Sequence, residues 1–168
     1  FKVSLAEQLK FSEESTFTAY ASIRETNRIL AEEGSEPAIA YARSEFISQP
    51  SLALAYRLAQ LYASEAKDRE AVEVLKIIRF MTSYSVDDFV LIQKIANFLH
   101  TRGESEMAFN IYKNLLEERD LDKQLKIALF QGGARIAVTQ NEPVIASRWN
   151  LEASKLKSPP TPRPTNKK

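Results

Sequence analysis

The sequence holds few side chains that could do chemistry. Its 168 residues include no Cys, so a thiol nucleophile, a disulfide and a Cys-based zinc site are excluded. His100 is the single His, and any metal site would therefore be built from carboxylates. An imidazole can act as a general base, but the sequence shows no partner for it. We interpret His100 as a surface residue near a helix C-terminus.

Three acidic doublets are the other candidates for acid–base work: Glu32–Glu33, Asp87–Asp88 and Glu117–Glu118. Adjacent helical residues point about 100° apart, so no doublet forms a facing pair of carboxyl groups. We expect solvated helix ends instead. A glycine-rich phosphate loop, a GxSxG elbow and an HExxH helix are also missing. The sequence predicts a protein that is not an enzyme and has no catalytic residue, cofactor or metal.

The composition, 44% hydrophobic and 27% charged with a net charge of +1, is typical of one soluble domain. No apolar run approaches the roughly 18 to 20 residues of a membrane span. Four basic residues and no acid fall in 157–168, which leaves a net charge of −3 for the rest. Because Phe1 is not an initiator residue, we expect a cut or processed chain, and both the cytoplasm and a bacterial envelope stay open as compartments.

Proline positions divide the chain into helices. No Pro occurs between Ser51 and Glu142, and apolar residues recur there at spacings of three and four. Pro37 and Pro143 indicate helix starts, and Pro50 indicates a break. We expect seven or eight helices, at about 13–33, 37–48, 51–65, 68–82, 87–101, 104–118, 122–139 and 143–156. The expected organisation is an N-terminal segment (1–12), a helical domain (13–156) and a disordered basic tail (157–168).

Glycines add two expectations. Gly34 and Gly103 stand where helices must end, as Gly does at helix C-termini. Gly132–Gly133 falls inside a helical pattern, where each Gly costs roughly 1 kcal/mol relative to Ala. Close packing of a neighbouring helix, or a kink, would account for this pair.

One spacing of apolar residues recurs three times, in steps of 37 and 38 residues. It places a large residue beside a small one on a first helix, an Ala on the next helix, and large residues four and seven positions further on. The three sets are Leu58, Ala59, Tyr62, Ala71, Leu75, Ile78; Ile95, Ala96, Leu99, Ala108, Tyr112, Leu115; and, with smaller residues, Gly133, Ala134, Ala137, Ala146, Asn150, Ala153. Stacked helix pairs would bury these faces, with Ala59, Ala71, Ala96 and Ala108 at the crossings.

At these residues the sequence resembles the tetratricopeptide repeat family, best over 57–78 and 94–116. The resemblance covers 51–156 and, more loosely, the preceding helix pair, where Glu45 replaces an apolar residue. The family repeats every 34 or so residues, so the links here are longer, and in this they are similar to Sel1-like repeats. The resemblance implies an all-α, right-handed α-α superhelix of antiparallel helix pairs that acts as a protein-interaction scaffold.

The resemblance also implies a binding surface on the concave face, lined by the first helices of successive pairs. Arg57, Lys94 and Arg135 would form a basic ladder there, suited to an acidic or extended peptide; solvated charges are the alternative. The carboxylate-clamp pattern of some family members is not reproduced. The complete expected set is Tyr56, Arg57, Gln60, Gln93, Lys94, Asn97, His100, Gln131 and Arg135.

Other functions stay open as alternatives. The main one is a structural subunit, in which the same surface serves permanent assembly in a larger complex such as one of the cell envelope. Base stacking on RNA by Phe80, Tyr84, Phe89, Phe98, Phe109 and Tyr112 conflicts with the acidic body, and we assign these rings to the core. The PxxP at Pro159–Pro162 is interpreted as a linker rather than a docking motif. Trp149 should either pack inward with Ile145 or mark a contact face. The oligomeric state is open.

Overall fold

The computed structural model describes residues 13–80, 88–117 and 121–157. These ranges are helical and hold no strand, which confirms the all-α prediction. The elements are α2 (Glu13–Glu33), α3 (Ser35–Ser48), α4 (Leu52–Ser64), α5 (Asp68–Leu75), the 3-10 helix η1 (Lys76–Phe80), α6 (Asp88–Thr101), α7 (Ser105–Glu117), α8 (Lys123–Thr139) and α9 (Pro143–Lys157).

The helix predicted over 68–82 is the one clear difference. It is α-helical only to Leu75 and continues as a 3-10 helix to Phe80. The adjacent residues Ile77 and Ile78 are both β-branched, which lowers helix propensity, and both are buried. Expectations for the segment 1–12, Tyr84, Asp87, Glu118 and the Pro-rich tail concern residues outside the described ranges.

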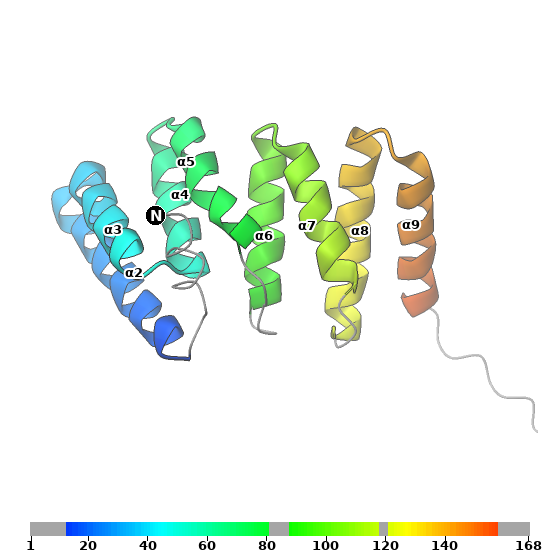
Figure 1. Ribbon diagram of the computed structural model, residues 1–168, viewed down its shortest axis with the longest axis horizontal. Coiled ribbons are helices and arrows are strands. Elements are labelled where there is room, and N and C mark those ends of the chain that lie inside the picture. Colours follow the sequence, from blue (N-terminus) through cyan, green and yellow to red (C-terminus); the bar gives the residue numbers. More distant parts are fainter. Residues whose placement is uncertain (1–12, 81–87, 118–120, 158–168) are drawn as a thin grey trace, which may run out of the picture. The chain divides into compact units, whose positions relative to one another are not determined.

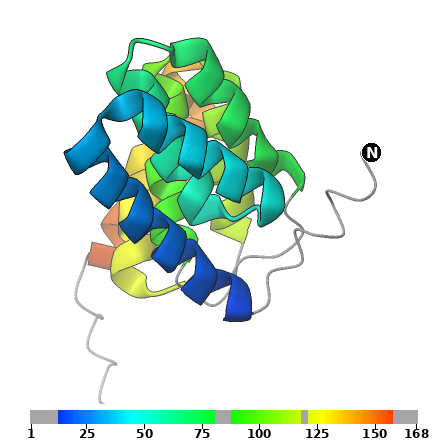
Figure 2. The ribbon, with the colours of Figure 1, turned by 90° about the vertical axis from the view of Figure 1, so that its left-hand side faces the viewer.

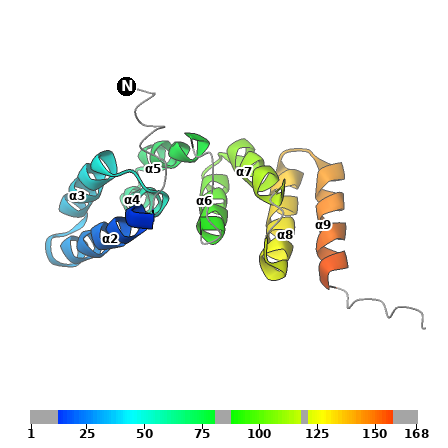
Figure 3. The same ribbon diagram turned by 60° about the horizontal axis from the view of Figure 1, so that its bottom comes forward.

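The chain divides into two compact units, Phe1–Glu104 and Ser105–Lys168. In the first, α2 pairs with α3 and α4 pairs with α5 (Figure 1). The two first helices of these pairs, α2 and α4, also contact each other (Figure 3), and α6 contacts α4 and α5. In the second unit α8 pairs with α9 and packs against α7. Helices adjacent in sequence thus form hairpins, whereas the expected single domain over 13–156 and the superhelix stay predictions.

Three of the turns between successive helices repeat one backbone conformation. Ala66, Gly103 and Asn141 have φ values of 56°, 87° and 57°, and they are separated by the 37- and 38-residue steps of the sequence repeat. After each, the next N–H donates to a carbonyl five residues back: Lys67 to Tyr62 (2.9 Å), Glu104 to Leu99 (3.0 Å) and Glu142 to Ala137 (2.9 Å). This is a Schellman-type helix end. The repeat predicted from side chains is therefore present in the backbone as well.

The alanines of the repeat are buried. Ala59, Ala71, Ala96 and Ala108 are all 0% exposed, as predicted. The large residues beside them, among them Leu58, Leu75, Ile95, Leu99 and Tyr112, are also fully buried. The third set departs from this pattern, since Asn150, at the position of Tyr112, is exposed.

Gly132 and Gly133 receive aromatic rings from both neighbours of α8. A Cβ on Gly132 would lie 2.6 Å from the Tyr112 hydroxyl oxygen of α7, and one on Gly133 would lie 2.8 Å from the ring of Trp149 on α9. Close packing thus explains the pair, and α8 runs unbroken through it. Trp149 is 5% exposed and stacks at a tilt on Phe109, with ring centroids 5.7 Å apart. The inward alternative for Trp149 is the correct one.

The first helix pair replaces part of this apolar contact with polar groups. Figure 2 shows α2 and α3 lying side by side. Between them Ser22, which is buried, donates from Oγ to Oε2 of Glu45 (2.9 Å), and the buried Thr26 hydroxyl donates to the Ser22 carbonyl (2.7 Å). Burying Glu45 partly is tolerable because its carboxylate has this partner. The pair departs from the apolar repeat template for this reason.

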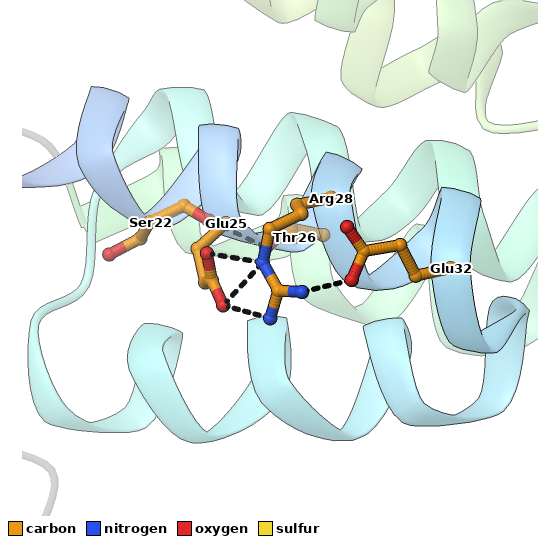
Figure 4. A network of polar contacts seen from close by, with 5 residues as sticks. All are labelled: Ser22, Glu25, Thr26, Arg28 and Glu32. Carbon is orange, nitrogen blue, oxygen red and sulfur yellow. Dashed lines mark hydrogen bonds and ion pairs between the residues drawn. The ribbon is translucent and has the colours of Figure 1, made fainter.

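Charged groups on α2 form an exposed network (Figure 4). Arg28 bonds Glu25 through Nε and Nη2 and pairs with Glu32 through Nη1. The hydrogen bond from Arg28 lowers the pKa of Glu25, and the same carboxylate raises the pKa of Arg28. Exposed pairs of this kind contribute little stability. Of the acidic doublets, Glu32 and Glu33 are exposed at the helix end, as predicted.

Candidate functional site

A hollow of about 400 Å³ lies in the first unit among α2, α4 and α6. Four of the predicted groove residues line it together: Tyr56, Arg57, Gln60 and Lys94. The remaining lining is largely apolar and includes Tyr20, Ile23, Val90 and Leu91, with Asp88 at the start of α6. The site therefore combines an apolar lining with two cations, Arg57 and Lys94, and the carboxylate of Asp88.

The side chain of Arg57, on α4, is held by a hydrogen bond to α2. Its Nε donates to Oδ1 of Asn27 on α2, at 2.8 Å. Among the described residues, no group accepts a hydrogen bond from its terminal nitrogens. Lys94, on α6, is exposed at the same hollow. Both cations are thus placed to meet an anionic group that enters the hollow.

Tyr56, one of two tyrosines in the lining, packs against α6. Its ring meets the Phe98 ring edge to face, with centroids 6.0 Å apart and planes at 77°. Arg102 covers Phe98 at 3.6 Å from the ring centroid and donates from Nε to Oδ1 of Asp68 on α5, at 3.0 Å. Phe98 therefore supports Tyr56 directly, and Arg102 supports Phe98 in turn, which lowers the entropy that a ligand must remove.

The other expected residues are not among those that line the hollow. Gln93, Asn97 and His100 lie on α6 but do not line it, whereas Gln131 and Arg135 belong to α8 of the second unit. Arg135 is exposed and its Nε donates to the carbonyl of Gln131, at 3.4 Å. The ladder of Arg57, Lys94 and Arg135 stays a prediction.

Sequence reasoning missed the apolar members of the site. Tyr20 is 63% exposed and Val90 is 49% exposed, although both belong to helices with a buried face. The sequence feature that could have indicated these residues is a large apolar side chain at a position that the helical period places on the solvent side of its helix. The repeat template did not reveal it because the template describes buried positions only.

The described residues also bear on two other kinds of site, a metal centre and a membrane-spanning helix. They contain no cluster of three His, Asp or Glu residues placed to hold a metal ion. No helix among them is both long enough and apolar enough to cross a bilayer. Of the aromatic residues considered for base stacking, Phe89, Phe109 and Tyr112 are buried and thus belong to the core, as expected.

Comparison with known proteins supports the fold. No family model and no curated protein matches the sequence. Among solved structures, the chain is similar to PilF of Pseudomonas aeruginosa, a tetratricopeptide-repeat protein, with a TM-score of 0.58. The chain has a tetratricopeptide-like fold. The match covers 86% of this chain but 64% of PilF, at 16% identity, so the likeness concerns the fold alone.

Proposed function

We propose that the chain is a non-enzymatic protein-interaction scaffold that binds a partner through the first-helix face of its tetratricopeptide-like pairs. The observation that carries this proposal is the hollow among α2, α4 and α6, where an apolar lining meets Arg57 and Lys94. Ligand sites in proteins are typically concave and mostly apolar with a few placed polar groups. Folds of this type are typically scaffolds.

The partner segment proposed for this face is extended and acidic. Axes of packed helices lie about 8–10 Å apart, so the cations of α4 and α6 are spaced for successive side chains rather than for a single carboxylate. That spacing is close to the Debye length of about 8 Å at physiological salt. The cations would therefore speed association more than they select a sequence. Arg135 belongs to α8 of the second unit, and its part as a third cation is proposed from the sequence repeat alone.

Charge reversal tests the proposal. Fluorescent peptides of alternating acidic and apolar residues serve as probes, with binding followed by anisotropy at low and physiological salt. Lys94→Glu should weaken binding about tenfold, mainly through slower association, and Arg135→Glu should weaken it further. Arg43→Glu is the matched control, because Arg43 is exposed on α3 and does not line the hollow. Equal binding by the Lys94 and Arg43 variants would remove this face from consideration.

A structural subunit of a larger complex is the second candidate. It is favoured by exposed aliphatic residues on α9, where Val144 is 79% exposed and Leu151 is 55% exposed. Permanent interfaces are more apolar than transient ones. Dilution separates the two: a permanent complex stays intact in sedimentation at nanomolar concentrations, whereas a transient one dissociates.

A further inference from the structure

The outward face of α9 consists of four exposed residues: Val144, Arg148, Leu151 and Lys155. Their spacing of four, three and four residues places them in one line along the helix. Aliphatic and basic side chains alternate along this line. We call these four residues the α9 stripe.

The α9 stripe lies opposite the side by which α9 joins its unit. That inner side carries Ala146, Trp149 and Ala153, all of which are buried. At 100° per residue, Val144 and Leu151 are about half a turn away from Ala146 and Ala153. Val144 and Leu151 therefore take no part in the helix packing of the unit, whereas Arg148 borders a hollow that residues of α7 and α8 also line.

The α9 stripe also lies on a different side of α9 from the one on which a further helix pair would pack. In α7 that side is marked by Tyr112, which is seated against α8. The equivalent residue of α9 is Asn150, and its neighbours on that side are Ser147 and Ser154; all three are exposed. Ser154 donates to the Asn150 carbonyl at 2.9 Å. Since this side is polar, the exposed aliphatic residues are not the bare face of a repeat stack.

Equivalent positions on the other second helices carry charges. Val144 corresponds to Glu106 of α7 and Arg69 of α5, and Leu151 corresponds to Lys113 and Lys76. Glu106, Arg69 and Lys113 are exposed and Lys76 is half-buried. The repeat therefore places solvent-facing charges at these positions, and α9 alone replaces them with aliphatic residues.

We propose that the α9 stripe is a docking surface for an acidic amphipathic helix of a protein partner. Aliphatic residues seven positions apart match the apolar seam of a second helix. Arg148 and Lys155 lie between and beside them, so charge complementarity calls for Glu or Asp on the partner. Lys155 already pairs with Glu152 at 2.7 Å, but the pair is exposed and exchanges at little cost.

An anionic membrane surface is the competing occupant, and the structure favours it less. Membrane-surface helices bury a broad apolar face with Trp, Phe or Leu. Here the only Trp of α9 is buried in the unit, and the outward face has two aliphatic residues. The area available for insertion is therefore small.

The test uses a synthetic helical peptide as probe, with Leu at heptad positions a and d, Glu at e and g, and a length of three heptads, about 21 residues. A peptide of the same composition in scrambled order is its control. Binding to the intact chain is followed by anisotropy. We expect the ordered peptide to bind at least about tenfold more tightly than the scrambled one, because scrambling removes the apolar seam.

Two variants use residues that the chain itself has at equivalent positions: Val144→Glu and Leu151→Lys, combined in one protein. This variant should lose binding at least about tenfold while its thermal unfolding stays that of the parent chain. Arg148→Glu with Lys155→Glu should lose the Glu peptide and gain a Lys-for-Glu version of it. Ile47→Glu is the control, since Ile47 is 65% exposed on α3 in the other unit.

Three results would overturn the proposal: equal binding of ordered and scrambled peptides, no binding at all, or binding that survives both stripe variants. Vesicles of phosphatidylglycerol provide the remaining comparison. Capture by vesicles that depends on Val144 and Leu151, without peptide binding, would assign the stripe to a membrane surface instead. Lys94→Glu changes the proposed groove but not the stripe. A negative result with the stripe variants can therefore be told apart from a negative result for the groove.

Discussion

The guanidinium carbon of Arg102 lies 3.6 Å from the centroid of the Phe98 ring, and Phe98 precedes Arg102 by about one helical turn in the sequence. Arg102 also reaches Asp68 of α5, and Phe98 supports Tyr56 of α4. A single cation thereby links α5 to the aromatic part of the hollow. This relation makes Arg102 a positioning residue for the proposed binding face.

The first prediction separates the two contacts of Arg102. Its partner Asp68 has a side chain that is 64% exposed, so the ion pair contributes little. The stacking on Phe98 is partly desolvated, since the Arg102 side chain is 24% exposed, and contributes about 0.5–1 kcal/mol or more. Urea unfolding should therefore show a loss of about 1 kcal/mol for Arg102→Gln and at most about 0.5 kcal/mol for Asp68→Asn. A larger loss from Asp68→Asn would contradict this ranking.

The second prediction concerns the repeated turn. Ala66 has a φ of 56°, a conformation that costs a non-Gly residue about 1 kcal/mol or more, whereas Gly103 takes the equivalent place at φ 87° without a Cβ. Ala66→Gly should therefore raise the free energy of unfolding by about 0.5–1 kcal/mol, and Gly103→Ala should lower it by about the same amount. Ala63→Gly, inside α4, is the control and should be destabilising by about 1 kcal/mol. Chemical denaturation measures all three.

The core and the turns were predictable from sequence because both depend on local spacing. Alanines at the repeat positions must be buried for helices to approach, and Gly34 and Gly103 must end helices. Glu45 could be seen as a departure, but not its partner Ser22, which is 23 residues away in the sequence. The hollow was only half predicted: Arg57 and Lys94 follow from the repeat, whereas Tyr20 lies on α2, a helix outside the strict register. Contacts between such irregular helices depend on tertiary packing that a repeat template does not describe.

The third prediction is a loss of stability at alkaline pH that depends on Tyr41. Partial burial, with the nearby carboxylates of Glu45 and Glu25, raises the pKa of the Tyr41 phenol above its ordinary value. In the unfolded chain the phenol ionises near pH ~10. Its stabilising contribution is thus complete below about pH 10 and is lost as the pH rises through the higher pKa of the folded state.

Tyr41→Phe removes the ionising hydroxyl and should flatten this alkaline decline. The measurement is urea unfolding at about pH 8 and again between about pH 10 and 11, with parent and variant compared at each pH. The difference in the absorbance titration at 295 nm between the two proteins reports the phenol itself. Parallel stability curves for both proteins across this range would contradict the role of Tyr41.

The last prediction concerns Gly133. Within a helix, replacing Gly by Ala gains about 1 kcal/mol of helix propensity. Here the new Cβ would lie 2.8 Å from the Trp149 ring and 3.3 Å from the Tyr112 ring, and both rings are buried. Neither ring can leave without opening the unit, so overpacking of about 1–3 kcal/mol should outweigh the gain. Gly133→Ala should therefore lower the free energy of unfolding, whereas Ser147→Ala, on the exposed side of α9, should change it by less than about 0.5 kcal/mol.

Trp149 fluorescence gives a second measurement of the same packing. Iodide should hardly quench this fluorescence in the parent chain and should quench it more in Gly133→Ala. A stabilised variant with unchanged quenching would show that the rings move aside freely, and that the glycine pair is not required for the packing of α7 and α9 on α8.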